Sequence, residues 1–460
     1  FSFGRLQAQN SIAMVYNGVL YVTSSFNRVF CLDAATGKEI WRYEHELPAD
    51  VYPYLCCDVI NRGVSLYHDK VYLAALDCRI VALNNMTGAV VWDKTYGDYH
   101  ANYSFALQPL VVKGKLIVGP QGAEFGIRGW TLAVDAETGE EVWKFNNVPG
   151  PDERNFVLEG GPNKGNPNYP GDAWKTGGGS IWTTASYDPE LDLIYQPIGN
   201  PSPDFDRHVR SGAPPGDPNF KCDNLYTAST IVLDPDNGEL KFWFQYTPND
   251  PYDYDAIGEA LLMTDKETGQ KVWVMANRNG YFYKIDRTNG KYIQAITYCE
   301  VNVWKGIDEN GRVIPNWPEM DVVYDRVTKN ILPILDGGKN WHPMAYSPIT
   351  DLCYIPSFNR SMDMQAGEQE WVRGEWFLGL RLIKQNTGND QFKAIKCSGD
   401  MDVAWSVTNP YPVKGGALVT AGGIVFTGTA DGEIWVLDAE TGEKLRVFQV
   451  GTGVHGQFSS

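Results

Sequence analysis

The chain has 460 residues, of which 43% are hydrophobic and 21% charged, and its formal net charge at pH 7 is -17. This composition predicts a globular protein, and the excess of acidic residues argues against binding to nucleic acid, whose phosphates a negative surface repels. No stretch approaches the roughly 18 consecutive apolar residues of a membrane helix, so we expect no membrane span.

The eight cysteines contain neither a CxxC pair nor the CxxCH signature of attached haem, and the six histidines are scattered. A zinc site or a covalently bound haem is therefore not predicted. Cys56 and Cys57 are adjacent in the sequence. For neighbouring cysteines in general, two separate buried thiols are a simpler interpretation than a disulfide in a small ring, and the sequence leaves both open.

A short motif with a tight turn recurs along the whole chain. Its copies are CLDAATGKEIW (31–41), ALNNMTGAVVW (82–92), AVDAETGEEVW (133–143), VLDPDNGELKFW (232–243), KIDRTNGKYIQ (284–294) and VLDAETGEKLR (436–446). The turn glycines are separated by 51, 51, 99, 52 and 152 residues, which we interpret as one, one, two, one and three steps of about 51 residues.

Each copy reads as two strands joined by a tight reversal, and a further hairpin signal precedes it. Four short strands in every unit of about 51 residues predict an all-β fold, an eight-bladed β-propeller with Trp-docking repeats that forms a single domain over residues 1–460. The alternative, an array of β-sandwiches, does not need an aromatic residue at a fixed place such as Trp41, Trp92 or Trp143.

Two stretches interrupt the repeat. Residues 149–179 are rich in Gly, Pro and Asn, and residues 299–341 carry no clear repeat, so we expect both to be loops on one face of the propeller, where sites are usually built. A further candidate for a site is the acidic stretch TPNDPYDYDAIGE (247–259). In an extended segment Asp253 and Asp255 would share a face, and two like charges that close need a cation. The alternative is a polar turn, because Pro and Asn are turn formers.

Seven motifs together resemble one known family. They are LCCDVINRG (55–63), GAEFGIRG (122–129), DAWKTGGGSIW (172–182), IGNPSP (198–203), PYDYD (251–255), NRNGYFYKIDRTNGK (277–291) and GGKNWHPMAYSP (337–348). The family is that of the alcohol dehydrogenases that depend on pyrroloquinoline quinone (PQQ), the methanol and ethanol quinoproteins. The likeness spans nearly the entire chain, with the motifs in the family's order.

The resemblance implies a PQQ site. Cys56 and Cys57 would form a vicinal disulfide against one face of the PQQ ring, and Trp182 would stack on the other face. The polar contacts to the cofactor would come from Arg62, Ser180, Arg278 and Asn340. Taken singly, an Arg or Asn in a turn is commonly a capping residue, and a Trp in a propeller commonly belongs to the core.

The resemblance also implies a metal ion and a reaction. Glu124, Asn200 and Asp253 match the family's ligand positions, and all offer the oxygen donors that a hard cation prefers. Asp253 would take the proton of a primary alcohol while hydride moves to the quinone, which gives an aldehyde. Asp255 resembles the second Asp of the lanthanide enzymes, so a lanthanide is expected, with calcium (Ca²⁺) as the alternative. Asp255 could otherwise cap the turn or bond Arg278.

Further expectations concern the surroundings of the enzyme. A vicinal disulfide implies an oxidising compartment, the bacterial periplasm. The absence of CxxCH implies that electrons leave to a separate soluble cytochrome c-type acceptor, and a homodimer is left open. Relatives are longer at both ends, so the closing strands of the propeller are expected to be truncated or rebuilt. The chain departs from the family at four positions expected near the cofactor, Asn10, Ala106, Gln121 and Lys414.

A second function class remains as an alternative. Non-catalytic propellers with the same repeat, such as the outer-membrane assembly scaffold lipoproteins, keep the Trp motif and bind proteins. That interpretation does not account for the Cys-Cys pair, Glu124 or Asp253.

Overall fold

The computed structural model describes residues 10–212 and 221–458 of the chain. Within these residues nearly all regular structure is β, which confirms the predicted class. The helical elements are α1 (Arg207–Ser211) and the 3₁₀ turns η1 (Tyr52–Tyr54), η2 (Tyr99–Ala101), η3 (Ala123–Phe125) and η4 (Ala173–Thr176). No helix in the described part of the chain has the length and apolar character needed to cross a membrane.

The described residues form seven four-stranded antiparallel sheets. The first four are β1 (Met14–Tyr16), β2 (Val19–Ser24), β3 (Arg28–Asp33) and β4 (Glu39–Glu44); β5 (Ser65–Tyr67), β6 (Lys70–Ala74), β7 (Arg79–Asn84) and β8 (Val90–Thr95); β9 (Leu110–Val112), β10 (Lys115–Val118), β11 (Trp130–Asp135) and β12 (Glu141–Asn146); and β13 (Ser186–Asp188), β14 (Leu193–Pro197), β15 (Ser229–Leu233) and β16 (Leu240–Gln245).

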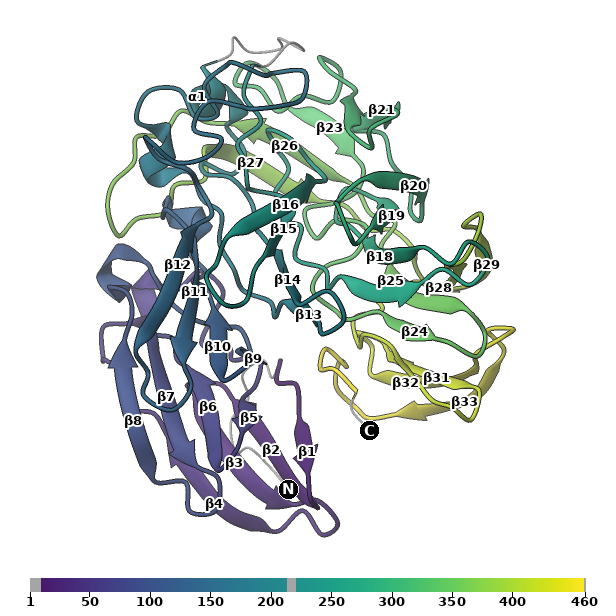
Figure 1. Ribbon diagram of the computed structural model, residues 1–460. Helices are drawn as coiled ribbons and strands as arrows, with labels where there is room; N and C mark the ends of the chain where they lie inside the picture. Colours follow the sequence, from purple (N-terminus) through teal and green to yellow (C-terminus); the bar gives the residue numbers. More distant parts are fainter. Residues whose placement is uncertain (1–9, 213–220, 459–460) are drawn as a thin grey trace.

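The remaining three four-stranded sheets are β17 (Leu261–Thr264), β18 (Lys271–Ala276), β19 (Tyr281–Asp286) and β20 (Tyr292–Thr297); β24 (Ala345–Ser347), β25 (Leu352–Ser357), β28 (Asp390–Lys396) and β29 (Val403–Asn409); and β30 (Leu418–Val419), β31 (Ile424–Gly428), β32 (Glu433–Asp438) and β33 (Lys444–Gln449). The sheets follow one another around a curve in chain order, and both termini lie on the same side, beside the first and last sheets (Figure 1). The propeller is confirmed, whereas the count of eight blades stays a prediction.

One sheet is interrupted. Strands β26 (Met362–Ala366) and β27 (Leu380–Gln385) leave between β25 and β28 and pair with β23 (Thr328–Ile331), and a small hairpin of β21 (Trp304–Ile307) and β22 (Val313–Pro315) precedes them. The 152-residue interval between turn glycines therefore contains these additions and a single interrupted four-stranded sheet before the last one. The 99-residue interval leads from the third sheet directly to the fourth and includes an insertion, so it is one step and not two. The 152-residue interval is two steps and not three, so our interpretation of both intervals was wrong.

The conserved spacing of the motif has a physical cause in the contact between neighbouring sheets. The Trp41 indole N–H donates to the carbonyl of Asn85 at 3.0 Å. Its ring covers the turn glycine of the next motif, since a Cβ on Gly88 would lie 2.7 Å from that ring. Trp92, Trp143 and Trp405 make the same pair of contacts with the turns that contain Gly139, Gly238 and Gly442. The predicted Trp docking is thus an inter-sheet contact.

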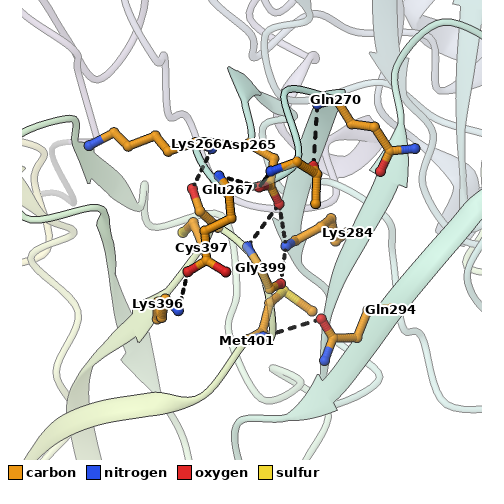
Figure 2. Close-up of polar contacts among 12 residues, drawn as sticks. Asp265, Lys266, Glu267, Gln270, Lys284, Gln294, Lys396, Cys397, Gly399 and Met401 are labelled. Atoms are coloured by element: carbon orange, nitrogen blue, oxygen red, sulfur yellow. Dashed lines mark hydrogen bonds and ion pairs between the residues drawn. The ribbon is translucent and has the colours of Figure 1, made fainter.

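A buried ion pair joins the fifth and sixth sheets (Figure 2). Lys284 on β19 contacts the Asp265 carboxylate at 2.9 Å, and both side chains are 2% exposed. Lys284 also donates to the carbonyl of Gly399, which follows β28, and the N–H of Gly399 donates back to Asp265. Burial alone would raise the pKa of Asp265, but the hydrogen bond from Lys284 and further donors lower it to about 2. The Asp265 carboxylate is therefore ionised at neutral pH.

We expect Lys284→Met to lower the free energy of unfolding by about 3–5 kcal/mol, because it leaves the Asp265 carboxylate buried without its cation. Urea-induced unfolding followed by tryptophan fluorescence measures the change. The matched control is Lys396→Met, which removes an exposed lysine that pairs with Glu267 in the same network and should barely move the midpoint. Equal midpoints for the two variants would contradict the assigned role of Lys284.

Candidate active site

A cavity of about 500 Å³ brings together most of the residues that the sequence singled out. Nine of the eleven predicted site residues line it, namely Cys56, Cys57, Arg62, Glu124, Trp182, Asp253, Asp255, Arg278 and Asn340. The other two, Ser180 and Asn200, are buried, with exposed fractions of 1% and 0%. Residues separated by nearly 300 positions in the sequence thus lie around one cavity.

Backbone hydrogen bonds hold the predicted metal ligands together. Glu124 lies in η3, and the carbonyl of Ile127, just after it, accepts from the N–H of Gly178 at 2.9 Å. The neighbouring N–H of Gly179 donates to the carbonyl of Asn200 at 2.9 Å. Gly178 has φ +82°, and a Cβ there would lie 2.5 Å from the Asn200 carbonyl, so only glycine permits this approach.

The segment around Asp253 is a turn, so the expected extended conformation was wrong. Asp253 has φ 63°, in the left-handed region, and the Asp250 carboxylate accepts the N–H groups of Tyr252 and Tyr254, which fixes the turn. The Asp253 and Asp255 carboxylates nonetheless meet at one cation, because Nη1 of Arg278 lies 3.4 and 3.3 Å from them. The segment is therefore the polar turn of the alternative, and the two carboxylates still approach the same group, as predicted.

Hydrogen bonds among the described residues leave some oxygens of this cluster unsatisfied. Among the described residues, one side-chain oxygen in each of Glu124, Asn200, Asp253 and Asp255 is buried and accepts no hydrogen bond. Burial raises the pKa of all three carboxyl groups, and the proximity of Asp255 raises those of Glu124 and Asp253 further. Arg278 counteracts this but is a single positive charge. Buried, unpartnered oxygen donors of this kind fit a hard metal cation.

Arg62 presents the opposite charge without a partner. It is 6% exposed, and no carboxylate of the described chain forms an ion pair with it, while its Nε and Nη1 atoms donate no hydrogen bond. Burial lowers its pKa to about 9. Its guanidinium carbon lies 4.6 Å from the centre of the Trp182 ring and 5.3 Å from that of Trp341. A buried guanidinium between aromatic rings in a cavity fits an anionic, planar ligand.

The adjacent cysteines are joined. The Sγ atoms of Cys56 and Cys57 are 2.31 Å apart, as a vicinal disulfide, which resolves the alternative of two separate thiols. A carboxylate oxygen of Glu124 and the two sulfurs lie within 4.8 Å of one another. Disulfide sulfurs are not thiolate ligands, so this proximity places Glu124 beside the disulfide and does not define a second metal site.

The other predicted cofactor contacts are held by their neighbours. The Trp182 indole N–H donates to Asp255 at 3.1 Å, and Asn340 donates to Asp336 at 2.9 Å. Ser180 is buried and is not among the residues that line the cavity, and its hydroxyl has no hydrogen-bond partner within the described residues. Gly337 has φ +74°, and a Cβ there would lie 2.4 Å from that of Arg278, so the backbone packs tightly against this arginine.

The four positions that depart from the family pattern have different surroundings. Asn10 and Gln121 line the cavity, and the carbonyl of the buried Ala106 accepts the backbone N–H of Arg62. Lys414 forms an ion pair at 3.0 Å with Asp336, the residue that orients Asn340.

Sequence reasoning missed the loop between β26 and β27. The N–H of Phe377 donates to the carbonyl of Glu124 at 2.7 Å, and the indole of Trp371 donates to the carbonyl of Phe125 at 2.9 Å. Trp376 packs on the Phe125 ring with centroids 4.5 Å apart and lines the cavity. The loop therefore fixes the turn that carries Glu124. Its signal was two tryptophans at 371 and 376 outside the repeat. Asp204, another cavity residue, was also missed.

Comparison with known proteins gives consistent matches. A family model described as "Glucose/ethanol/alcohol dehydrogenase, beta-propeller domain" matches residues 4–311. The quinoprotein alcohol dehydrogenase PedH of Pseudomonas putida is 38% identical over 99% of this chain and 77% of its own length. A lanthanide-dependent methanol dehydrogenase of Methylacidiphilum fumariolicum is 33% identical over 99% of this chain and 76% of its own length. The solved structure of a europium-containing methanol dehydrogenase has a TM-score of 0.91 at 33% identity, covering 99% of this chain and 81% of that one.

The disulfide makes a direct prediction. Under denaturing conditions without reductant, six cysteines should react with a thiol reagent, because Cys31, Cys78, Cys222, Cys299, Cys353 and Cys397 are unpaired. After reduction all eight should react. Peptide mapping should locate the additional two at Cys56 and Cys57. Eight reactive thiols before reduction, in protein purified without reductant, would rule out the disulfide.

Proposed function

The chain belongs to the family of PQQ-dependent (quinoprotein) alcohol dehydrogenases, and we propose from this that it oxidises a primary alcohol to an aldehyde with PQQ as cofactor. The observation that carries the proposal is the cavity in which an unpaired Arg62, a vicinal disulfide and unpartnered oxygen donors meet. The alternative of a protein-binding scaffold leaves these buried polar groups without a use, and relatives that match 99% of the chain are named as dehydrogenases.

The residues around the cavity fit a planar, anionic quinone. PQQ, when bound, supplies the group that accepts hydride from the alcohol. Cys56 and Cys57 would provide an apolar disulfide surface for its ring, and Trp182 an aromatic one. Arg62 and Arg278 would bind its oxygens, since a guanidinium matches carboxylate geometry. Ser180 and Asn340 would add polar contacts, and the Lys414–Asp336 ion pair would hold Asn340 in place.

Asp253 is proposed as the general base. One of its oxygens is buried in the cavity region without a hydrogen bond among the described residues, so it is available to take the proton of the alcohol hydroxyl. A base must be ionised, and burial opposes this by raising the pKa of Asp253. Arg278 lies 3.4 Å from the carboxylate and favours the ionised form.

A cation bound near Asp253 would, like Arg278, favour the ionised form of this carboxylate. Glu124, Asn200, Asp253 and Asp255 would hold it, and when bound it supplies Lewis acidity. Three carboxylates face one arginine here, so a trivalent ion neutralises more of their mutual repulsion than a divalent ion of similar radius does. We therefore propose a lanthanide as the preferred ion, with calcium as the alternative. Asp255 also contacts Arg278 and Trp182. It would keep these two contacts when it binds the metal ion.

Three further proposals concern the cellular setting. The vicinal disulfide supports an oxidising compartment, the periplasm. The net charge of -17 supports a basic, soluble electron acceptor, for which a cytochrome c-type protein is proposed. A homodimer is the oligomeric state to test first, by light scattering.

Replacement of the base should abolish turnover without unfolding the protein. We expect Asp253→Asn to reduce alcohol oxidation about 100-fold or more, measured with an artificial dye acceptor in the PQQ-loaded enzyme, because general base catalysis contributes at least about that factor. Circular dichroism and PQQ absorbance check folding and loading. Asp172→Asn, a change at a carboxylate that is 78% exposed, should leave turnover unchanged. Full activity of Asp253→Asn would rule out the assignment.

Metal preference can be tested by activation and, independently of turnover, by metal binding. We expect metal-stripped, PQQ-loaded protein to be activated by lanthanum or cerium more strongly than by calcium, and Asp255→Ala to lose this preference because it removes one negative charge. Terbium luminescence sensitised by Trp182, whose indole contacts Asp255, reports binding independently of turnover. Full activity with calcium, and no gain from any lanthanide, would leave calcium as the native ion.

A further inference from the structure

One side of the cavity differs in character from the part that Arg62 and the metal ligands occupy. Its lining there is apolar, and consists of Phe205, Leu335, Trp376, Leu378, Leu380 and Ile383. Most of these side chains belong to one packed cluster around β23, β26 and β27, so this side is a firm wall. An apolar wall beside the base suits the hydrocarbon part of an alcohol.

Asp204 is the carboxylate next to Phe205 in this wall. Asp204 lines the cavity, is 1% exposed, and has a buried Oδ1 atom that accepts no hydrogen bond from any described residue. Its backbone is held on both sides, because the N–H of Phe205 donates to the carbonyl of Leu378 and the Asp204 carbonyl accepts from Arg210. The backbone that carries this side chain is therefore fixed, while its Oδ1 atom lacks a donor among the described residues.

A structural role does not account for the Asp204 carboxylate. Arg210 is the arginine closest in sequence, and its guanidinium is occupied by the Asn224 side chain and by the carbonyls of Pro203, Asp204 and Asp250. No ion pair with the Asp204 carboxylate occurs among the described residues, so folding leaves it unsatisfied. A buried acceptor without a donor is costly, and such groups persist where a ligand supplies the donor.

The charged groups around Asp204 are mostly of its own sign. Asp253 and Glu124, both assigned to the metal and base machinery, are close enough to raise the pKa of Asp204, in addition to the larger effect of burial, and Arg210 opposes this. Asp204 therefore lies within electrostatic reach of the reacting end of the cavity, whose lining it shares with Asp253. A second donor group on a short substrate would reach Asp204 while its first hydroxyl meets Asp253.

We propose that Asp204 accepts a hydrogen bond from a second donor group of the substrate, so that the enzyme favours short alcohols with a second hydroxyl or ammonium group over simple alkanols. This inference rests on the proposed alcohol oxidation and adds its substrate class. A hydroxyl and an ammonium group are equivalent for this purpose, because both donate a hydrogen bond to a carboxylate oxygen. The donor is contributed by the substrate and takes no part in the redox step.

Three probes of equal size test the proposal. 1-Butanol, 1,3-propanediol and 3-amino-1-propanol differ only in a terminal methyl, hydroxyl or ammonium group. With the PQQ- and metal-loaded enzyme, kcat/KM for the diol or the amino alcohol, relative to 1-butanol, should fall about tenfold or more in Asp204→Leu, chiefly through KM, because the variant removes the acceptor oxygen. Comparing ratios between enzymes cancels intrinsic differences between the substrates.

Two variants serve as controls. Asp204→Asn keeps the shape and an acceptor oxygen but cannot ionise beside an ammonium group, so it should penalise the amino alcohol more than the diol. It also remains available if Asp204→Leu fails to fold. Asp58→Asn removes a carboxylate from the same cavity lining outside the apolar wall and should leave the substrate ratios unchanged.

The outcomes distinguish a failure of the substrate inference from a failure of the proposed alcohol oxidation. Turnover of 1-butanol with unchanged ratios in both Asp204 variants would overturn the substrate inference and leave alcohol oxidation standing. Weaker terbium binding in these variants, with unchanged ratios, would likewise overturn it and assign Asp204 to the cation. No turnover of any alcohol by the loaded parent enzyme would overturn the proposed function and this inference with it.

Discussion

The contact between an indole ring and a turn glycine is the constraint on which the rest of the structure depends. Trp41 covers Gly88, and the same pairing, with an indole hydrogen bond to the neighbouring turn, recurs at three further contacts between sheets, made by Trp92, Trp143 and Trp405. Each ring excludes any Cβ at the glycine and so fixes the distance between neighbouring sheets. Rigid spacing of the sheets sets the positions of their loops, and those loops carry the site.

The site itself is built against stability. Asp255 is buried, and Glu124 and Asp253 are partly buried, near a single arginine, while Arg62 is buried without a carboxylate partner among the residues that the structure describes. Each of these groups loses hydration on folding that the protein alone does not replace. Between the sheets, by contrast, a buried charge such as Asp265 is paired with Lys284. The opposite signs of the unmatched groups divide the cavity into a region for a cation and one for an anion.

The insertion in the sixth sheet contacts both the turn that carries Glu124 and the apolar wall of the cavity. The loop between β26 and β27 holds the Glu124 turn through Phe377 and Trp371, and β27 supplies Leu380 and Ile383 to the apolar wall. One insertion thus fixes a metal ligand and shapes the space beside the base. A change in this loop is expected to alter both, since the same backbone carries both contacts.

The sequence alone determined the β-propeller, because a motif of period about 51 residues with a Trp and a turn Gly follows from local strand and turn chemistry. Through the family resemblance it also named residues such as Cys56 and Glu124, which the structure brings to one cavity. It did not determine the meaning of the 99- and 152-residue intervals, or the left-handed turn at Asp253, which the Asp250 carboxylate imposes. Asp204 gave no signal at all, because its lack of a partner arises only when distant segments pack around it. Tertiary structure decides which buried charges are paired, since burial and pairing depend on contacts between residues far apart in the chain.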